Sequence, residues 1–166
     1  MSRLVVALCA VAALAMVACG TPSAGGVDGH AIKPLAAGAM PATLGDLEVH
    51  AEDITATLGQ ARNSYADRLS LYSLRKNNLV FATLEISRLT SGFDYKSVKQ
   101  RALLADKVGG AKSEEHRVGP VVVYLTSGLR QRISVWFTGR HLFVLSTRED
   151  YDQPRTLLRN ALAVTP

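Results

Sequence analysis

The feature that most constrains the fold is a series of three β-prone segments in the C-terminal half, separated by short pairs that contain glycine. The segments are residues 121–126, 129–138 and 141–148, and the pairs are Ser127-Gly128 and Gly139-Arg140. β-branched and aromatic side chains favour strands, and a glycine-containing pair suits the two-residue loop of a tight hairpin. The pattern therefore predicts a three-strand antiparallel meander.

The two tight turns also predict which side chains share a face. Counting outward from them pairs Trp136 with Phe143 in one hairpin and Val122 with Ile133 in the other. Alternate side chains of a strand point to opposite faces, so the meander separates into two sets. The first set, expected to form the core under helices, comprises Val122, Tyr124, Ile133, Val135, Phe137, Leu142 and Val144. The second set comprises Val121, Val123, Leu125, Trp136, Phe143 and Leu145, joined by Arg130, Arg132 and His141.

The second set is too apolar to face water freely and has two interpretations. Either a further strand or helix covers it, or it is a surface that binds a partner or ligand. Tryptophan and arginine are enriched at the energetic centres of interfaces. The candidate patch residues are therefore Arg130, Arg132, Trp136, His141 and Phe143. A one-residue error in either turn would exchange the two faces.

Turn and capping residues predict the remaining elements. Asn77-Asn78 tolerates positive φ and separates two β-prone runs, which predicts a hairpin of residues 69–75 and 79–89. Asp94 is placed to cap a helix over 95–108, and Gly109-Gly110 is placed to end it.

A closing helix is expected after Asp152, which is placed to cap it, with Pro154 in its first turn. The order is hairpin, helix, three-strand meander and C-terminal helix. We expect residues 46–166 to form a single α+β domain, with an antiparallel sheet of about five or six strands and the helices packed on one face.

The N-terminal residues predict export. Residues 4–19 contain no charge and follow Arg3. A cationic start followed by an apolar run is typical of a secretion signal, and this run is shorter than the roughly 20 residues that cross a bilayer.

The end of this run, Val17-Ala18-Cys19-Gly20, resembles the lipobox of bacterial lipoproteins, although Met16 stands where leucine is usual. The resemblance covers residues 1–20 only. It implies that residues 1–18 are a signal peptide cleaved before Cys19, and that Cys19 carries palmitate-type acyl chains that hold the protein on the extracytoplasmic face of the cell membrane. The alternatives are an ordinary secretory signal or an uncleaved anchor. Cys9 would leave with the signal peptide, so no disulfide is expected.

Residues 19–45 follow as lipidated Cys19 and a stretch dominated by Gly, Ala and Pro without apolar periodicity. Such a stretch cannot offset its ordering entropy by burial, so a flexible tether is expected.

The chain lacks the usual markers of catalysis. It has no Gly-x-Ser-x-Gly, Gly-x-x-x-x-Gly-Lys or Gly-x-Gly-x-x-Gly sequence. Its four histidines are scattered without the spacing of metal ligands, and Glu114-Glu115-His116 is best explained as a solvated strand edge. The net charge of +5 is mildly basic, and nucleic-acid binding would require a denser stripe of basic residues than the chain carries. We therefore expect no enzyme activity, no metal or other cofactor and no nucleic-acid partner.

These expectations combine into a hypothesis about function. We expect a membrane-anchored lipoprotein that acts as a non-enzymatic binding or accessory domain for a cell-envelope protein. The alternative is a carrier or sensor of an apolar small molecule or lipid, held between the sheet and the helices.

Overall fold

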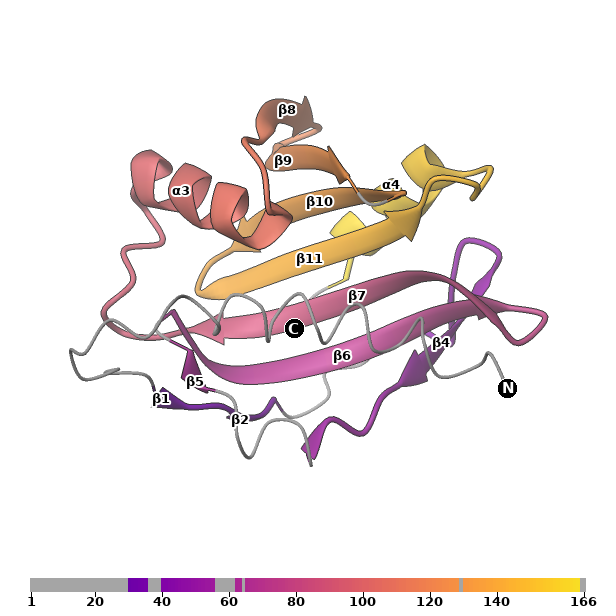
Figure 1. The fold of residues 1–166 in the computed structure, drawn as a ribbon, viewed down its shortest axis with the longest axis horizontal. Helices are drawn as coiled ribbons and strands as arrows, with labels where there is room; N and C mark the ends of the chain where they lie inside the picture. Colours follow the sequence, from indigo (N-terminus) through magenta and orange to yellow (C-terminus); the bar gives the residue numbers. More distant parts are fainter. Residues whose placement is uncertain (1–29, 36–39, 56–61, 64, 129, 165–166) are drawn as a thin grey trace.

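The computed structural model describes residues 30–35, 40–55, 62–63, 65–128 and 130–164 (Figure 1). Within these residues the main sheet has nine strands, and it is larger than the five or six expected. Eight strands lie in the order β3-β4-β6-β7-β11-β10-β9-β8, all antiparallel, and β2 pairs in parallel with β6. A separate two-stranded sheet joins β1 to β5. The strands are β1 (His30–Ala31), β2 (Lys33–Pro34), β3 (Thr43–Leu44), β4 (Leu47–Ala51), β5 (Arg62–Asn63), β6 (Ala66–Lys76), β7 (Leu79–Leu89), β8 (Glu114–Val118), β9 (Val121–Gly128), β10 (Gln131–Thr138) and β11 (His141–Arg148), and the helices are α3 (Val98–Gly109) and α4 (Pro154–Leu162).

The first hairpin forms where it was predicted. Asn77 and Asn78 both have positive φ, at 51° and 62°, and they join β6 to β7 with Lys76 opposite Leu79. Asparagine tolerates this backbone region better than most residues, which is why the pair identifies the turn. The α+β class is likewise confirmed.

The meander is confirmed, with an error in one of its turns. Trp136 lies opposite Phe143, as predicted. The other turn comes two residues later than predicted, because the last paired residue of β9 is Gly128, opposite Gln131, and not Thr126. As a result Val123 lies opposite Trp136 and not opposite Arg132, which is a shift of four residues along β10. Four is an even number, so each side chain still points to the predicted face.

A further strand, β8, extends the meander to four strands. It pairs with β9, with Val118 opposite Val121, and Gly119, at φ 59°, lies in the turn between them. Glu114, Glu115, His116 and Arg117 are all exposed on this edge strand. The interpretation of Glu114-Glu115-His116 as a solvated edge is therefore confirmed.

Both helices begin later than predicted. Ser97 caps α3 and accepts a hydrogen bond from the Gln100 N–H, whereas Asp94 accepts one from the Lys96 N–H in the preceding turn. The helix ends at the predicted glycines, with Gly110 in the left-handed region at φ 71°. The N-cap of α4 is Gln153 and not Asp152, because the proline ring occupies the first helical position.

The helices lie on opposite faces of the sheet, so the prediction of helices on one face was wrong. The core under α3 contains Tyr65, Ala66, Leu89, Leu104, Ala105, Tyr124, Val135, Leu142 and Val144. The core under α4 contains Leu44, Leu47, Tyr72, Leu74, Ala82, Leu84, Ile86, Val123, Trp136, Phe143, Leu145, Tyr151, Leu157, Ala161 and Val164. Because both faces of the meander are apolar, each one requires its own cover.

The folded domain begins before residue 46. β2 pairs with β6 through Lys33 and Arg68, and Ile32 and Leu44 are 5% and 3% exposed. The prediction of a flexible tether is therefore wrong for residues 30–35 and 40–45. The strands β1, β2 and β3 have two residues each, and β2 contains Pro34. They are too short to show the alternation of apolar and polar residues that indicates a strand. Cys19, the expected signal peptide and the rest of the expected tether lie outside the described residues.

Candidate functional site: a basic cleft at the end of the meander

The face that contains Trp136 is covered by α4. Trp136 is 1% exposed and Phe143 is fully buried, and their rings stack with centroids 5.1 Å apart. Leu157 and Ala161, one helical turn apart on α4, belong to the same core. Of the two interpretations of this face, coverage by another element holds for Trp136 and Phe143, which cannot contact a partner directly.

The other three candidate residues do not form one patch with them. Arg130 is exposed in the β9–β10 turn, at φ 61°. Arg132 lies opposite Thr147, whereas His141 lies opposite Thr138, at the other end of the same pair of strands. Burial lowers the pKa of His141, and the nearby Arg88 and Arg140 lower it further. Of the five candidate residues, Arg132 alone lines the cleft described next.

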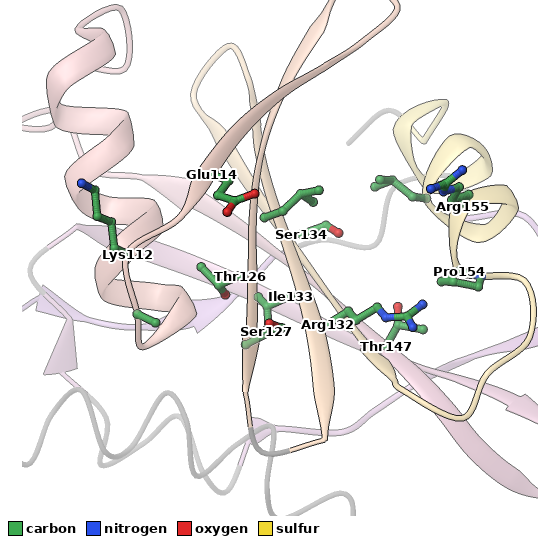
Figure 2. Close-up of a pocket in the computed structure, with 13 residues that line it drawn as sticks. Lys112, Glu114, Thr126, Ser127, Arg132, Ile133, Ser134, Thr147, Pro154 and Arg155 are labelled. Carbon is green, nitrogen blue, oxygen red and sulfur yellow. The ribbon is translucent and has the colours of Figure 1, made fainter.

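A cleft of about 560 Å³ opens beside α4 at the end of β10 that begins with Gln131. Figure 2 shows Lys112 and Glu114 on one side of it and Arg155 on the other, with Arg132 near Thr147 and Pro154. The lining residues come from the α3–β8 connection, β8, β9, β10, β11 and α4. They are Ala111, Lys112, Glu114, Leu125, Thr126, Ser127, Arg132, Ile133, Ser134, Thr147, Pro154, Arg155 and Leu158.

Strand alternation and the start of α4 bring the two arginines together. Arg132 and Ser134 project from the same face of β10 as Trp136. Trp136 lies beneath α4, whereas Arg132 is exposed at the outer end of the strand. Arg155 follows Pro154 in the first turn of α4. A second hollow of about 390 Å³ shares Arg132, Pro154 and Arg155, so the two arginines lie between the hollows.

The opposite wall is held by Asp106 of α3. Its carboxylate accepts hydrogen bonds from the Ser113 N–H at 2.7 Å and from the Ser113 hydroxyl at 2.6 Å. These bonds hold the pKa of Asp106 below its usual value, and a charged carboxylate accepts strongly. They fix the chain on either side of Ser113, where Lys112 and Glu114 lie.

The cleft carries an excess of positive charge. Lys112, Arg132 and Arg155 contribute three cations, and none of them forms an ion pair with any of the residues described. The lining carboxylate, that of Glu114, lies 3.4 Å from His116. The hydroxyls of Ser127, Ser134 and Thr147 add neutral hydrogen-bond donors, whereas the Thr126 hydroxyl donates to the Gly109 carbonyl. This set of groups is suited to binding an anion.

The sequence carried no signal for this cleft. Its walls come from segments around residues 112, 126, 133, 147 and 155, and no spacing links them before the chain folds. An apolar ligand was expected between the sheet and the helices, and on the α4 side Trp136 and Phe143 fill that space. Over the described residues there is also no cluster of three or more His, Cys, Asp or Glu side chains able to hold a metal ion.

Comparisons with protein-family models, curated proteins and solved structures found no match for this chain.

Proposed function

We propose that the protein is a bacterial lipoprotein anchored through Cys19 on the extracytoplasmic face of the cell membrane. Its domain binds, without catalysis, a cell-envelope component that carries phosphate or carboxylate groups. The observation that carries the binding proposal is the set of three cations, Lys112, Arg132 and Arg155, around one cleft without a carboxylate partner among the described residues.

The chemistry of the cleft supports an anionic ligand. A guanidinium group can donate two parallel hydrogen bonds to one phosphate or carboxylate, which makes arginine well suited to bind such groups. Two arginines between adjacent hollows could each hold one oxyanion of the same ligand. Leu125, Ile133 and Leu158 supply an apolar wall beside these charges.

The anchoring proposal is supported by the sequence around Cys19. No helix in the described part of the chain is long and apolar enough to cross a membrane. Two acyl chains on Cys19 would supply a stable attachment, since one chain binds only marginally.

Calorimetric titration of the detergent-solubilised protein tests the binding proposal. The probes are inorganic phosphate, glycerol phosphate and glucuronate. We expect at least one of them to bind, and Arg132→Gln and Arg155→Gln each to weaken binding by about 10- to 100-fold, the value of a charged hydrogen bond of about 1.5–3 kcal/mol. Arg130→Gln is the matched control, because it removes an exposed arginine that lies outside the cleft. Equal affinity in all three variants would refute a site in this cleft.

Intact mass measurement of the membrane-extracted protein tests the anchor separately. We expect a chain that begins at Cys19 and carries acyl groups, and we expect Cys19→Ser to move the protein out of the membrane fraction. A mass without acyl additions would overturn the anchor and leave the binding result unaffected.

A further inference from the structure

We propose that the outer face of α3 lies against the surface of an anionic phospholipid bilayer and holds the anchored domain in one orientation. This inference rests on the proposed lipid anchor at Cys19. It concerns a surface separate from the cleft, and the occupant is the membrane that carries the anchor.

The contact surface, here called the basic face of α3, consists of Lys99, Leu103 and Lys107, with Lys96 and Val98 exposed where the helix begins. Lys99, Leu103 and Lys107 follow each other at intervals of four residues, so they form one line along the helix. Leu104 and Ala105 lie on the opposite side, buried against the sheet. The helix therefore presents its line of lysines and one leucine outward.

Leu103 on this face and Val98 at the start of the helix are apolar side chains that nothing described covers. Val98 is 57% exposed and Leu103 is 60% exposed. Of the described residues, one other large apolar side chain, Leu79, is comparably exposed, and it lies at the β6–β7 hairpin. A helix with lysines around exposed apolar side chains matches the interfacial region of a bilayer, where the apolar groups enter and the ammonium groups meet phosphates.

The charges near α3 favour an anionic surface. Residues 94–107 contain four basic and two acidic side chains, and three of the basic ones, Lys96, Lys99 and Lys107, are exposed. Both acidic groups are hydrogen-bonded within the chain, Asp94 to the Lys96 N–H and Asp106 to Ser113. Lys107 also lies 5.8 Å from the centre of the Tyr65 ring, so it sits at the border of the face. The surface of α3 is thus complementary to phosphate headgroups.

The chain between Cys19 and β1 is short enough to keep the end of the domain that carries α3 near an anchored Cys19. The described chain starts at β1, which Figure 1 places at the same end of the molecule as α3 and away from the β6–β7 turn. Ten residues separate Cys19 from His30, and their fully extended length is at most about 35 Å. An anchor at Cys19 therefore keeps this end of the domain close to the membrane.

The experiment measures how deeply single positions enter the bilayer. The lipidated protein is reconstituted in phosphatidylcholine vesicles with and without phosphatidylglycerol, after a Leu103→Cys substitution is labelled with an environment-sensitive fluorophore. The matched control is Leu79→Cys, which has nearly the same exposure but lies at the β6–β7 hairpin, where Lys76 is paired with Asp46. Brominated lipids quench a label that enters the acyl region.

We expect the label at residue 103 to shift its emission to the blue and to be quenched when phosphatidylglycerol is present, and the label at residue 79 to be unaffected. Lys96→Gln and Lys99→Gln should each reduce the docked population about fivefold, which corresponds to about 1 kcal/mol per surface lysine. Arg159→Gln removes one exposed charge from α4, on the other face of the sheet, and should have no effect. Arg132→Gln should also have no effect, which separates this contact from binding in the cleft.

Two outcomes would overturn the proposal. One is a label at residue 103 that stays in water although the mass shows acylated Cys19, because the anchor is then present and the contact is absent. The other is equal quenching at residues 103 and 79, because the orientation is then not fixed. A protein without acyl groups that still binds phosphatidylglycerol vesicles through Lys96 and Lys99 would keep the contact and refute the anchor.

Discussion

The Tyr151 hydroxyl donates a hydrogen bond to the Asp46 carboxylate at 2.5 Å, across a separation of 105 residues in the chain. Lys76 donates to the other oxygen of the same carboxylate at 2.6 Å. These bonds, the one from Lys76 foremost, hold the pKa of Asp46 below its usual value. Burial and the adjacent carboxylate raise the pKa of Tyr151. Asp46 thus joins the β3–β4 turn, the β6–β7 hairpin and the segment before α4.

Removing the Tyr151 hydroxyl should loosen this junction. We expect Tyr151→Phe to lower the free energy of unfolding by about 1–3 kcal/mol, because a hydrogen bond to a charged group is lost while the ring remains packed. Urea denaturation measures the change. Tyr95→Phe is the control, since no described partner bonds its hydroxyl, and it should change stability little. Equal effects of the two substitutions would mean that the bond to Asp46 contributes nothing.

Glu85 predicts an unusual dependence of stability on pH. This carboxyl group is buried in β7 between Leu71 and Val144 of the neighbouring strands, and it accepts a hydrogen bond from the Ser87 hydroxyl at 2.8 Å. Burial raises its pKa from 4.5 to about 7. The folded protein therefore keeps the proton over a pH range in which the unfolded chain has lost it. Stability from this group should fall as the pH rises from about 4.5 to about 7, by about 3 kcal/mol in all.

Glu85→Gln isolates this contribution, because the amide does not titrate. Unfolding free energies of the two proteins should be similar near pH 4, and the variant should become the more stable one as the pH approaches 7. Glu115→Gln removes an exposed carboxylate on β8, and the unfolding free energy of this variant should follow that of the original chain at every pH. A constant difference between the Glu85 variant and the original chain across this range would contradict the shifted pKa.

Trp136 should behave as a core residue. Trp136→Ala removes a ring that is 1% exposed and stacked on Phe143, so we expect the free energy of unfolding to fall by about 3–5 kcal/mol. Leu79→Ala, at an exposed position, should cost far less. Thermal unfolding distinguishes the two. A Trp136→Ala variant as stable as the original chain would show that α4 does not cover this face.

Gly109 marks a close approach between α3 and β9. A Cβ at this position would lie 2.6 Å from the Thr126 hydroxyl oxygen and 2.8 Å from its methyl carbon. We expect Gly109→Ala to destabilise the fold by about 1–3 kcal/mol through overpacking. Thr126→Ala in the same chain should recover part of this loss, and a double-mutant cycle measures the coupling. Independent effects of the two changes would contradict the contact.

Local chemistry explains the parts of the fold that could be predicted. Asn77-Asn78 and Gly139 identify their turns because the residues there must adopt positive φ. The faces of the meander were also predictable, since a misplaced turn that shifts pairing by an even number of residues leaves each side chain on its face. These features depend on residues adjacent in the chain.

The parts that could not be predicted depend on distant contacts. Nothing near Trp136 in the sequence indicates that α4 crosses over it, and the short strand β2 exists because it pairs with β6. The cleft has the same origin, because its lining residues Lys112, Arg132 and Arg155 come from the α3–β8 connection, β10 and α4, which lie far apart in the sequence. Of the residues predicted as a surface patch, Arg132 reaches this site through strand alternation alone.

The position of α4 has a consequence for truncated chains. All the strands of the sheet precede it, so a chain that ends before Pro154 lacks the helix that covers the indole of Trp136 and the ring of Phe143. We expect such a chain to expose one apolar side of its sheet to water and to be cleaved by proteases. The last nine-residue helix therefore closes the core on this side.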